Sequence, residues 1–342
     1  MKRLIERYKN IRKKGMLEKK YVSKYAFVGI GQHSLYNLYP IIDFLGMDLK
    51  YILSKSNETA QLIAKRYPHI QSSTDIDQVL NDDEIKGVFI CAHPSAHYQL
   101  VKKVLQSDKH VFVEKPPCTT LDQLEDLITV ESQSGGTCLV GFQKRYAPSI
   151  VQLKKKIKAP LNYTYRYLTG AYPEGDSLLD LYIHPLNLIG HLFGDTTVTA
   201  INYSKTKGTE TIFLHTKHGD TIGNIELSTD HSWQNAKEYM EVNTPQNIYT
   251  LKNMEELIST PKQSSIFSIP IEKIFPKNQA DYTLNARNHF NPIFQNNQLY
   301  TMGYFDEIET FANLCEKGVN ENITTLAGCK DTYRLIKKIK EH

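Results

Sequence analysis

The sequence lacks the features that mark secreted, membrane-embedded and metal-binding chains. Its 342 residues include one tryptophan and five cysteines, which are widely separated and never form a Cys-x-x-Cys pair. This spacing predicts reduced thiols rather than a disulfide framework or a zinc site, and with them a cytoplasmic chain. No apolar run reaches the roughly 18 residues of a membrane helix, so we expect no membrane span. The basic start is not followed by the apolar segment of a secretory signal.

Positive charge is concentrated at the start of the chain. The net charge is +4, but residues 1–24 contain ten Lys or Arg against two Glu, a local balance of +8 that leaves −4 for the rest. We interpret residues 1–22 as a basic leader that is solvated and partly helical. Contact with a membrane surface, an acidic partner or nucleic acid is the alternative for this leader. For the chain as a whole we expect no nucleic-acid partner.

The length of the chain favours two domains over one core. In the first half, short apolar segments alternate with segments of helical pattern, which predicts a parallel sheet with helices on both faces. The strands are expected at 25–28, 49–53, 87–91, 111–113 and 137–142, and the helices at 35–45, 57–67, 75–80, 98–107 and 120–132. We therefore predict an α/β fold in which residues 23–144 form a dinucleotide-binding Rossmann domain.

The second half is expected to build a different sheet. Strand patterns recur at 161–168, 197–204, 211–217, 221–229 and 238–243, which predicts a large open sheet, mostly antiparallel or mixed. We assign residues 145–342 to a second α/β domain whose final helix packs back on the first domain, and the family resemblance given below implies that this domain binds substrate and forms oligomers. Residues 261–300 show little periodicity and are interpreted as a long excursion. It could cap the site, lie at an interface or be a variable insertion.

A glycine turn follows the first strand. Gly29 permits a tight turn, and Gly31 lets a pyrophosphate approach the amino end of the next helix, where backbone amides favour anions. Ser34 takes the place of the third glycine of the dinucleotide fingerprint. We therefore name Gly29, Gly31, Gln32, His33 and Ser34 as candidate cofactor-binding residues.

The second strand ends without the acidic residue that binds a ribose 2′-hydroxyl in NAD-dependent proteins. Ser54, Lys55 and Ser56 follow it instead, so no carboxylate would repel a 2′-phosphate. These three residues are candidate cofactor contacts, and we expect NADP to be preferred, with NAD as the alternative.

A lysine follows the buried strand over residues 111–113. Pro116 restricts the backbone of Lys115, and the carboxyl end of a parallel strand is where open α/β sheets bind ligands. Farther along, Asp180 and His184 are four residues apart, so on a helix they share a face, which Asn187 and His191 continue. Pro185 predicts a kink or a helix start near His184.

These motifs, in this order, resemble the glucose–fructose oxidoreductase / inositol dehydrogenase / rhizopine-catabolism (Gfo/Idh/MocA) family. The segments that carry the resemblance are Gly29-Ile-Gly31, Pro94-x-x-His97, His110 to Pro116, Val140 to Tyr146, Asp180 to Pro185 and the stretches from Tyr304 and from Gly328. The resemblance implies a nicotinamide cofactor, a sugar, nucleotide-sugar, cyclitol or related polyol substrate, and a homo-oligomer, dimer or tetramer, formed through the C-terminal sheet.

The resemblance also implies the roles of individual residues. Lys115, Asp180 and His184 would form the catalytic group, and the Lys115–Pro116 bond would often be cis. Pro94, His97, Glu114 and Lys115 would contact the cofactor. Gln143, Lys144 and Arg145 would join Lys115, Asp180 and His184 in binding substrate. No metal is implied.

The resulting hypothesis is reversible oxidation of a secondary alcohol. His184 would take the hydroxyl proton, and Asp180 would orient the imidazole or tune its basicity. Lys115 would stabilise the developing alkoxide. Two alternatives remain: a nicotinamide-retaining enzyme of glycosidase type without net redox change, and a cofactor-binding regulator. Trp233 could reach a sugar ring, but the sequence assigns it no role.

Overall fold

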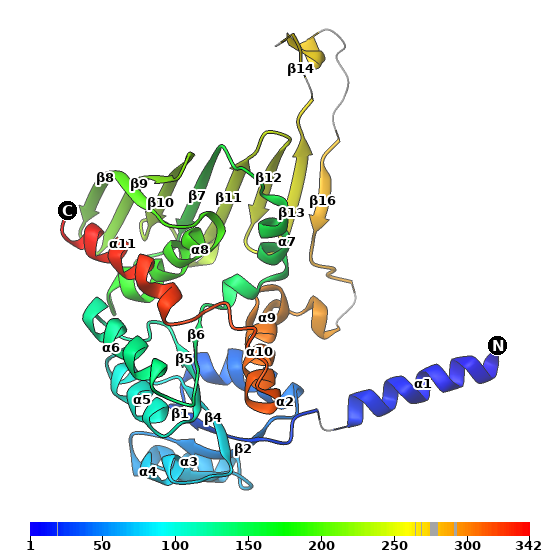
Figure 1. The fold of residues 1–342 in the computed structure, drawn as a ribbon, viewed down its shortest axis with the longest axis vertical. Coiled ribbons are helices and arrows are strands. Elements are labelled where there is room, and N and C mark those ends of the chain that lie inside the picture. The colour runs from blue at the N-terminus through cyan, green and yellow to red at the C-terminus, as the bar shows by residue number, and fades with distance from the viewer. Residues whose placement is uncertain (19, 264, 268, 274–279, 291–292) are drawn as a thin grey trace.

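The computed structural model describes residues 1–18, 20–263, 265–267, 269–273, 280–290 and 293–342. Within this part of the chain, two large sheets lie at different levels along the long axis of the molecule (Figure 1). One is a parallel Rossmann sheet and the other is a large mixed sheet, so the predicted fold class is confirmed. No helix of the described residues is long and apolar enough to cross a bilayer.

The Rossmann sheet has the strand order β3-β2-β1-β4-β5-β6, with every pair parallel. Its strands are β1 (Lys24–Val28), β2 (Asp48–Leu53), β3 (Gln71–Ser73), β4 (Ile85–Ile90), β5 (His110–Glu114) and β6 (Cys138–Gly141). Only β3, a short edge strand, is missing from the sequence prediction. The central strands are almost wholly buried, as their continuous apolar runs predict for a sheet covered on both faces.

Helices connect these strands. They are α2 (Tyr39–Phe44), α3 (Asn57–Arg66), α4 (Asp77–Leu80), α5 (Pro94–Gln106) and α6 (Leu121–Ser132). Helix α5 begins at Pro94 and not near residue 98, because the His93 side chain accepts a hydrogen bond from the Ser95 amide and proline suits the first turn of a helix. The helix predicted over 35–45 is divided into a π-helical turn, Ser34–Leu38, and α2.

One face of the Rossmann sheet carries an aromatic core that a late segment of the chain completes. Helix α10 (Tyr304–Lys317) packs there, and the ring of Phe311 lies 4.9 Å, centroid to centroid, from Phe89 in an edge-on arrangement. Phe89 also stacks on Phe27 at 5.6 Å. Part of the segment that the sequence assigns to the second domain therefore packs on the first sheet.

The second sheet has the order β16-β13-β12-β11-β7-β10-β9-β8. Its strands are β7 (Asn162–Leu168), β8 (Thr197–Thr206), β9 (Thr209–His218), β10 (Thr221–Ser228), β11 (Lys237–Asn243), β12 (Asn247–Lys252), β13 (Glu256–Pro261) and β16 (Tyr282–Asn285). The pair β10–β7 is parallel, and the sheet is therefore mixed. The sequence prediction omits β12, β13 and β16.

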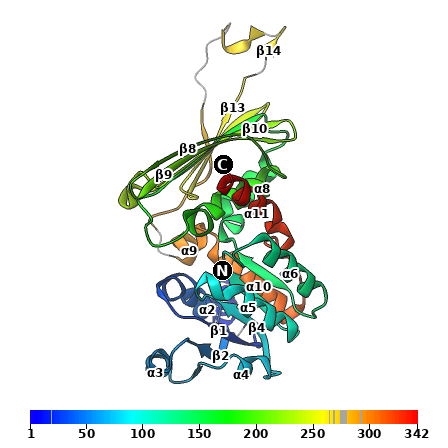
Figure 2. The same ribbon diagram turned by 90° about the vertical axis from the view of Figure 1, so that its left-hand side faces the viewer.

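Helices cover one face of this sheet and leave the other open. Figure 2 shows α8 (Ile183–Phe193) and α11 (Lys330–Lys340) on the side that faces the Rossmann domain, while α7 (Pro148–Lys156) packs near β13 and β16. The final helix α11 also contacts α6, and the Tyr333 hydroxyl donates to the Cys118 carbonyl at 2.6 Å. The last helix thus joins the two layers.

Two segments project from the body. The basic leader forms helix α1 (Lys2–Leu17), which extends away from both sheets (Figure 1). Within its described residues, the predicted 261–300 excursion contains the pair β14 (Ser265–Ile266) and β15 (Ile269–Pro270), the strand β16 and the short helix α9 (Gln298–Thr301). Residues 264, 268, 274–279 and 291–292 of this excursion lie outside the described residues.

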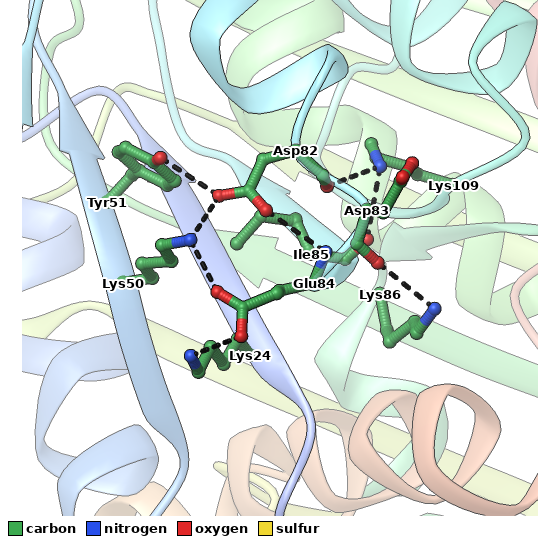
Figure 3. Close-up of polar contacts among 9 residues, drawn as sticks. All are labelled: Lys24, Lys50, Tyr51, Asp82, Asp83, Glu84, Ile85, Lys86 and Lys109. Atoms are coloured by element: carbon green, nitrogen blue, oxygen red, sulfur yellow. Dashed lines mark hydrogen bonds and ion pairs between the residues drawn. The ribbon is translucent and has the colours of Figure 1, made fainter.

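A cluster of charged residues ties the Rossmann strands together at the amino end of the sheet (Figure 3). Lys50 bonds to Asp82 and to Glu84, and Glu84 also accepts from Lys24 at 2.7 Å. The buried Lys109 ammonium donates to the Asp82 carbonyl at 2.9 Å. These contacts pair the charges with one another at the edge opposite the carboxyl ends of the strands.

Candidate active site

A cavity of about 890 Å³ lies where the carboxyl ends of β1, β4 and β5 face the second sheet. Residues of both layers line it. The carboxyl end of the strands is the usual place for a ligand in an open α/β sheet. The sequence-predicted residues among its lining are His33, Pro94, His97, Glu114, Lys115, Gln143, Lys144, Asp180 and His184.

The three residues of the expected catalytic group meet in this cavity. Lys115 follows β5, Asp180 lies in a π-helical turn (Leu178–Tyr182), and His184 lies in the first turn of α8. The Lys115 ammonium donates to the backbone carbonyl of Asp180 at 2.5 Å, and the Lys115–Pro116 peptide is cis. The contact between Lys115 and Asp180 joins segments that are 65 residues apart in the chain.

The imidazole of His184 is neutral at ordinary pH. Burial, followed by the nearby charges of Lys115 and Lys144, holds its pKa well below the usual value. Its ring packs edge-on against Phe142 with centroids 6.0 Å apart, and its buried Nδ1 has no hydrogen-bond partner among the described residues. A neutral imidazole in a cavity can accept a proton from a ligand.

The expected contact between Asp180 and His184 is not formed. The Asp180 carboxylate accepts from the Asp176 amide at 3.0 Å and from the Tyr172 hydroxyl at 3.3 Å. The loop before the π-helical turn therefore supplies its donors, so the prediction that Asp180 orients the imidazole is corrected. Asn187 and His191 do not line the cavity, because their side chains contact Arg145 and Lys154 instead.

Burial lowers the pKa of Lys115, and the carboxylates of Glu114 and Asp180 oppose that shift. A partly buried ammonium with few anionic partners favours a ligand that develops negative charge beside it. The electrostatics thus suit an oxygen that becomes an alkoxide.

Glu114 is paired at the side of the cavity that the Rossmann sheet forms. Its carboxylate lies 3.0 Å from Nε2 of His33, whose Nδ1 lies 2.9 Å from the Asn37 side-chain amide. Burial alone would raise the pKa of Glu114, but the charges of His33 and Lys115 lower it overall. The same pair raises the pKa of His33 against the effect of burial.

The glycine turn after β1 is open enough for a phosphate group. Gly29 has φ +93°, and a Cβ there would lie 2.4 Å from the Cys91 carbonyl oxygen, so only glycine fits. A Cβ at Gly31 would meet no atom within 4 Å, and a helical turn begins at the exposed Gln32. Ser34 is buried, with its hydroxyl accepting from the Gly31 amide at 2.9 Å, so serine is accommodated at the third position.

The residues after β2 lie outside the lining of the cavity. The Ser54 hydroxyl donates to the Ser56 carbonyl at 3.0 Å, and the Ser56 hydroxyl caps α3 by accepting from the Thr59 amide at 3.2 Å. Lys55 is exposed. Of these three side chains, Lys55 is the one whose charge remains available to a ligand at the surface.

His97 is 1% exposed and its two ring nitrogens lie 2.7 Å from the Pro116 carbonyl and 2.9 Å from the Ala92 carbonyl. It therefore joins the ends of β4 and β5 beneath the Lys115–Pro116 turn. Pro94, at the start of α5, lines the cavity above it.

The turn Gln143–Tyr146 divides its side chains between two environments. Gln143 donates to the Tyr304 hydroxyl at 3.2 Å, and Lys144 bonds to the buried Glu238 carboxylate at 2.7 Å, both beside the cavity. Arg145 does not reach it. Its guanidinium donates to the Asn187 side chain at 2.7 Å and the Ile323 carbonyl at 2.8 Å, so its placement among substrate-binding residues is corrected.

The sequence does not predict the other residues that line the cavity, which we call its second wall. They include Cys91, Tyr167, Tyr172, Trp233, Lys237, Glu238, Asn253, Glu255, Gln298 and Tyr304. The Tyr165 hydroxyl and Lys144 share the carboxylate of Glu238, and the Lys144 ammonium lies 4.6 Å from the centre of the Tyr167 ring. Trp233 is conspicuous in the sequence as the one tryptophan, and the other members carry no local motif.

Comparisons with known proteins agree with this fold. Residues 23–142 match the model of an oxidoreductase family with an NAD-binding Rossmann fold, known as Gfo/Idh/MocA. Over these residues the chain matches the Gfo/Idh/MocA family. The structure of this chain superposes on that of the dehydrogenase MviM of Clostridium difficile with a TM-score of 0.78 at 18% sequence identity. The match covers 93% of this chain and 99% of that one.

Curated relatives in this family match over shorter segments. The uncharacterized oxidoreductase YhhX of Escherichia coli is 34% identical over 93 residues, 27% of each chain. D-xylose dehydrogenase of Paenarthrobacter nicotinovorans is 28% identical over 139 residues, 38% of this chain and 36% of its own. The chain thus matches only about a third of the length of these two relatives.

Proposed function

We propose that the chain is an NAD(P)-dependent oxidoreductase that transfers hydride between a nicotinamide cofactor and a secondary hydroxyl or ketone of a sugar-like polyol. The observation that carries the proposal is the convergence of Lys115 and His184 on one cavity at the carboxyl end of the Rossmann sheet. The relation to D-xylose dehydrogenase supports a sugar or cyclitol as the substrate class.

The chain's own residues would move the proton and stabilise the charge. In the oxidative direction, the neutral His184 takes the proton of the substrate hydroxyl. Lys115 donates a hydrogen bond to the same oxygen as negative charge develops on it, as a preorganised oxyanion donor does. Asp180 acts on Lys115, through its carbonyl contact and the charge of its carboxylate, and not on His184.

The glycine turn fits a dinucleotide pyrophosphate. Gly31 leaves open space above its backbone, and the helical turn at Gln32 and His33 presents its first amides there. When bound, the nicotinamide ring supplies hydride chemistry, and Glu114, Pro94 and His33 would lie beside it.

We propose NADP as the preferred cofactor because Lys55 is exposed after β2 where a carboxylate would otherwise bind the ribose. Lys55→Ala should weaken NADP binding about tenfold or more, as loss of a charge-assisted hydrogen bond does, and leave NAD binding unchanged. Lys65→Ala, at the far end of α3, is the matched control. Titration of wild-type protein with both cofactors decides the matter, and equal or tighter NAD binding overturns the preference.

The decisive experiment for the activity is a screen of ring sugars, nucleotide sugars and cyclitols with each cofactor, followed by nicotinamide absorbance. Saturable reduction of the cofactor by at least one member is the expected result. A cofactor that binds but is reduced by none of them, and reduced cofactor that is oxidised by none of the corresponding ketones, would contradict the proposal.

We further propose that the chain forms a homo-oligomer through the open face of its mixed sheet. Exposed apolar side chains lie there, with Phe213 46% and Ile222 57% exposed. They alternate with polar pairs such as Arg166 and Glu226 on neighbouring strands. The domain boundaries 1–22, 23–144 and 145–342 and a cytoplasmic location, in keeping with five free cysteines, are part of the same proposal.

A further inference from the structure

Trp233 stands at the cavity in a position that the hydride-transfer chemistry does not use. It lines the cavity, yet 52% of its surface is exposed. It lies in a short turn, Trp233–Asn235, between β10 and β11. A ligand that enters the cavity could cover the exposed surface of this aromatic side chain and so remove apolar surface from water.

Backbone and side-chain hydrogen bonds hold this segment against the loop after β7. The Thr169 amide donates to the Ser228 carbonyl at 2.8 Å, and the His231 amide donates to the Thr169 carbonyl at 2.9 Å. The indole N–H of Trp233 then donates to the Ala171 carbonyl at 2.9 Å. Hydrogen bonds between the segments that follow β10 and β7 thus continue beyond the sheet, and the last of them is made by the indole.

The loop beneath the indole has the one residue that allows this approach. A Cβ at Gly170 would lie 2.4 Å from Cδ1 of Trp233 and 2.8 Å from its amide nitrogen. One part of the indole therefore rests on the backbone of Gly170, and its polar N–H is already bonded. What remains available to a ligand is apolar ring surface.

Polar groups complete the surroundings. Tyr172 joins this aromatic wall to the catalytic group, because its hydroxyl donates to the Asp180 carboxylate. Asn253, Glu255 and Gln298 also line the cavity. An apolar plane together with amide and carboxylate groups matches a six-membered ring polyol, which has C–H groups on its faces and hydroxyls around its rim.

We propose that Trp233 is the stacking platform of a subsite for a six-membered ring polyol, a pyranose or a cyclitol. The inference rests on the proposed function and makes it more specific, since it excludes open-chain polyols as good ligands. Trp233 acts in binding and not on the reacting atoms. It should therefore determine KM and leave kcat nearly unchanged.

The single tryptophan makes the platform directly observable, because all indole emission comes from residue 233. The protein saturated with oxidised cofactor is titrated with methyl β-D-glucopyranoside, D-xylose and myo-inositol, and with D-glucitol as the open-chain control. A saturable change in emission with at least one ring compound, and none with D-glucitol at the same concentration, is expected. No change with any ring compound, or an equal change with D-glucitol, overturns the proposal.

Variants separate the ring surface from the fold of the loop. Trp233→Ala should raise KM for a ring substrate about tenfold while kcat stays within about twofold, and Trp233→Phe, which keeps a ring but loses the N–H, should restore most of the affinity. Gly170→Ala keeps the indole but displaces it, and should raise KM as Trp233→Ala does. Tyr8→Ala, an exposed aromatic of helix α1, which extends away from both sheets, should change neither constant.

The two proposals can fail separately. Emission that saturates with a ring compound, without any change in nicotinamide absorbance, keeps the platform and removes the oxidoreductase activity. If a ring substrate is turned over and its KM is unaltered in Trp233→Ala, the activity stands and the platform is refuted. The same holds if KM is as high in Trp233→Phe as in Trp233→Ala.

Discussion

Replacing Lys115 with methionine tests the proposed chemistry most directly. Methionine keeps most of the length of the side chain and removes its charge. In the wild-type protein the ammonium of the partly buried Lys115 donates to the Asp180 carbonyl, and its pKa is lowered because burial disfavours the charge. The substitution therefore removes the one donor assigned to the substrate oxygen and leaves the fold of the turn in place.

The expected loss follows from the role of an oxyanion donor. Removal of one such donor lowers kcat by about 100- to 1000-fold. A second effect arises at His184, whose pKa is lowered first by burial and then by the charge of Lys115. In Lys115→Met that charge is absent, so the pKa of His184 rises and the acidic limb of the profile of kcat/KM against pH moves to higher pH.

The assay is the initial rate of cofactor reduction across the pH range, with cofactor affinity measured in parallel. Lys86→Met is the matched control, because Lys86 lies at the amino end of the sheet and contacts the Asp83 carbonyl there (Figure 3). Near-normal turnover in Lys115→Met would remove the residue from the mechanism. An acidic limb that stays in place while turnover falls would show that Lys115 and His184 do not share a site.

Two further predictions concern buried charges. Glu238→Gln leaves the Lys144 ammonium buried without its counter-ion, so the free energy of unfolding should fall by about 3 to 5 kcal/mol in urea denaturation, whereas Glu241→Gln on the exposed side of β11 should have little effect. Burial, with two neighbouring cations, lowers the pKa of His191 to about 3. The unfolded chain therefore binds a proton at this residue below its ordinary pKa of about 6.5 while the folded chain does not, and stability should decline as pH falls from there towards 3. His191→Asn should flatten that part of a plot of Tm against pH, and the exposed His215→Asn should not; coincident slopes for His191→Asn and wild type would refute the argument.

The cofactor half of the molecule was predictable because its information is local. Each buried parallel strand is a short apolar run, and the residues that bind ligands follow the strands directly, as Gly29 and Lys115 do. Parallel strands bring those ends to one edge. The positions of these motifs after the strands are therefore enough to predict where the cavity lies.

The second wall of the cavity could not be predicted in the same way. Glu238 reaches the cavity because β11 pairs with β7, about 70 residues earlier, and Tyr304 reaches it because α10 packs on the Rossmann sheet. Neither has a motif around it. Arg145 shows the converse: it lies beside Lys144 in the sequence, but α8 offers it Asn187 as a hydrogen-bond partner, and it turns away from the cavity.

The four-residue spacing of Asp180 and His184 places both residues at the cavity, but the predicted contact between their side chains is not formed. Pro185 lies in the first turn of α8, and the chain adopts a π-helical turn just before this helix, as it does before α2, whose first turn contains Pro40. In a π-helical turn the donor for the Asp180 carbonyl would be the amide of residue 185, and proline has none. That carbonyl accepts from Lys115 instead. Pro185 thus provides a physical reason why the backbone of Asp180, rather than its carboxylate, positions the ammonium beside His184.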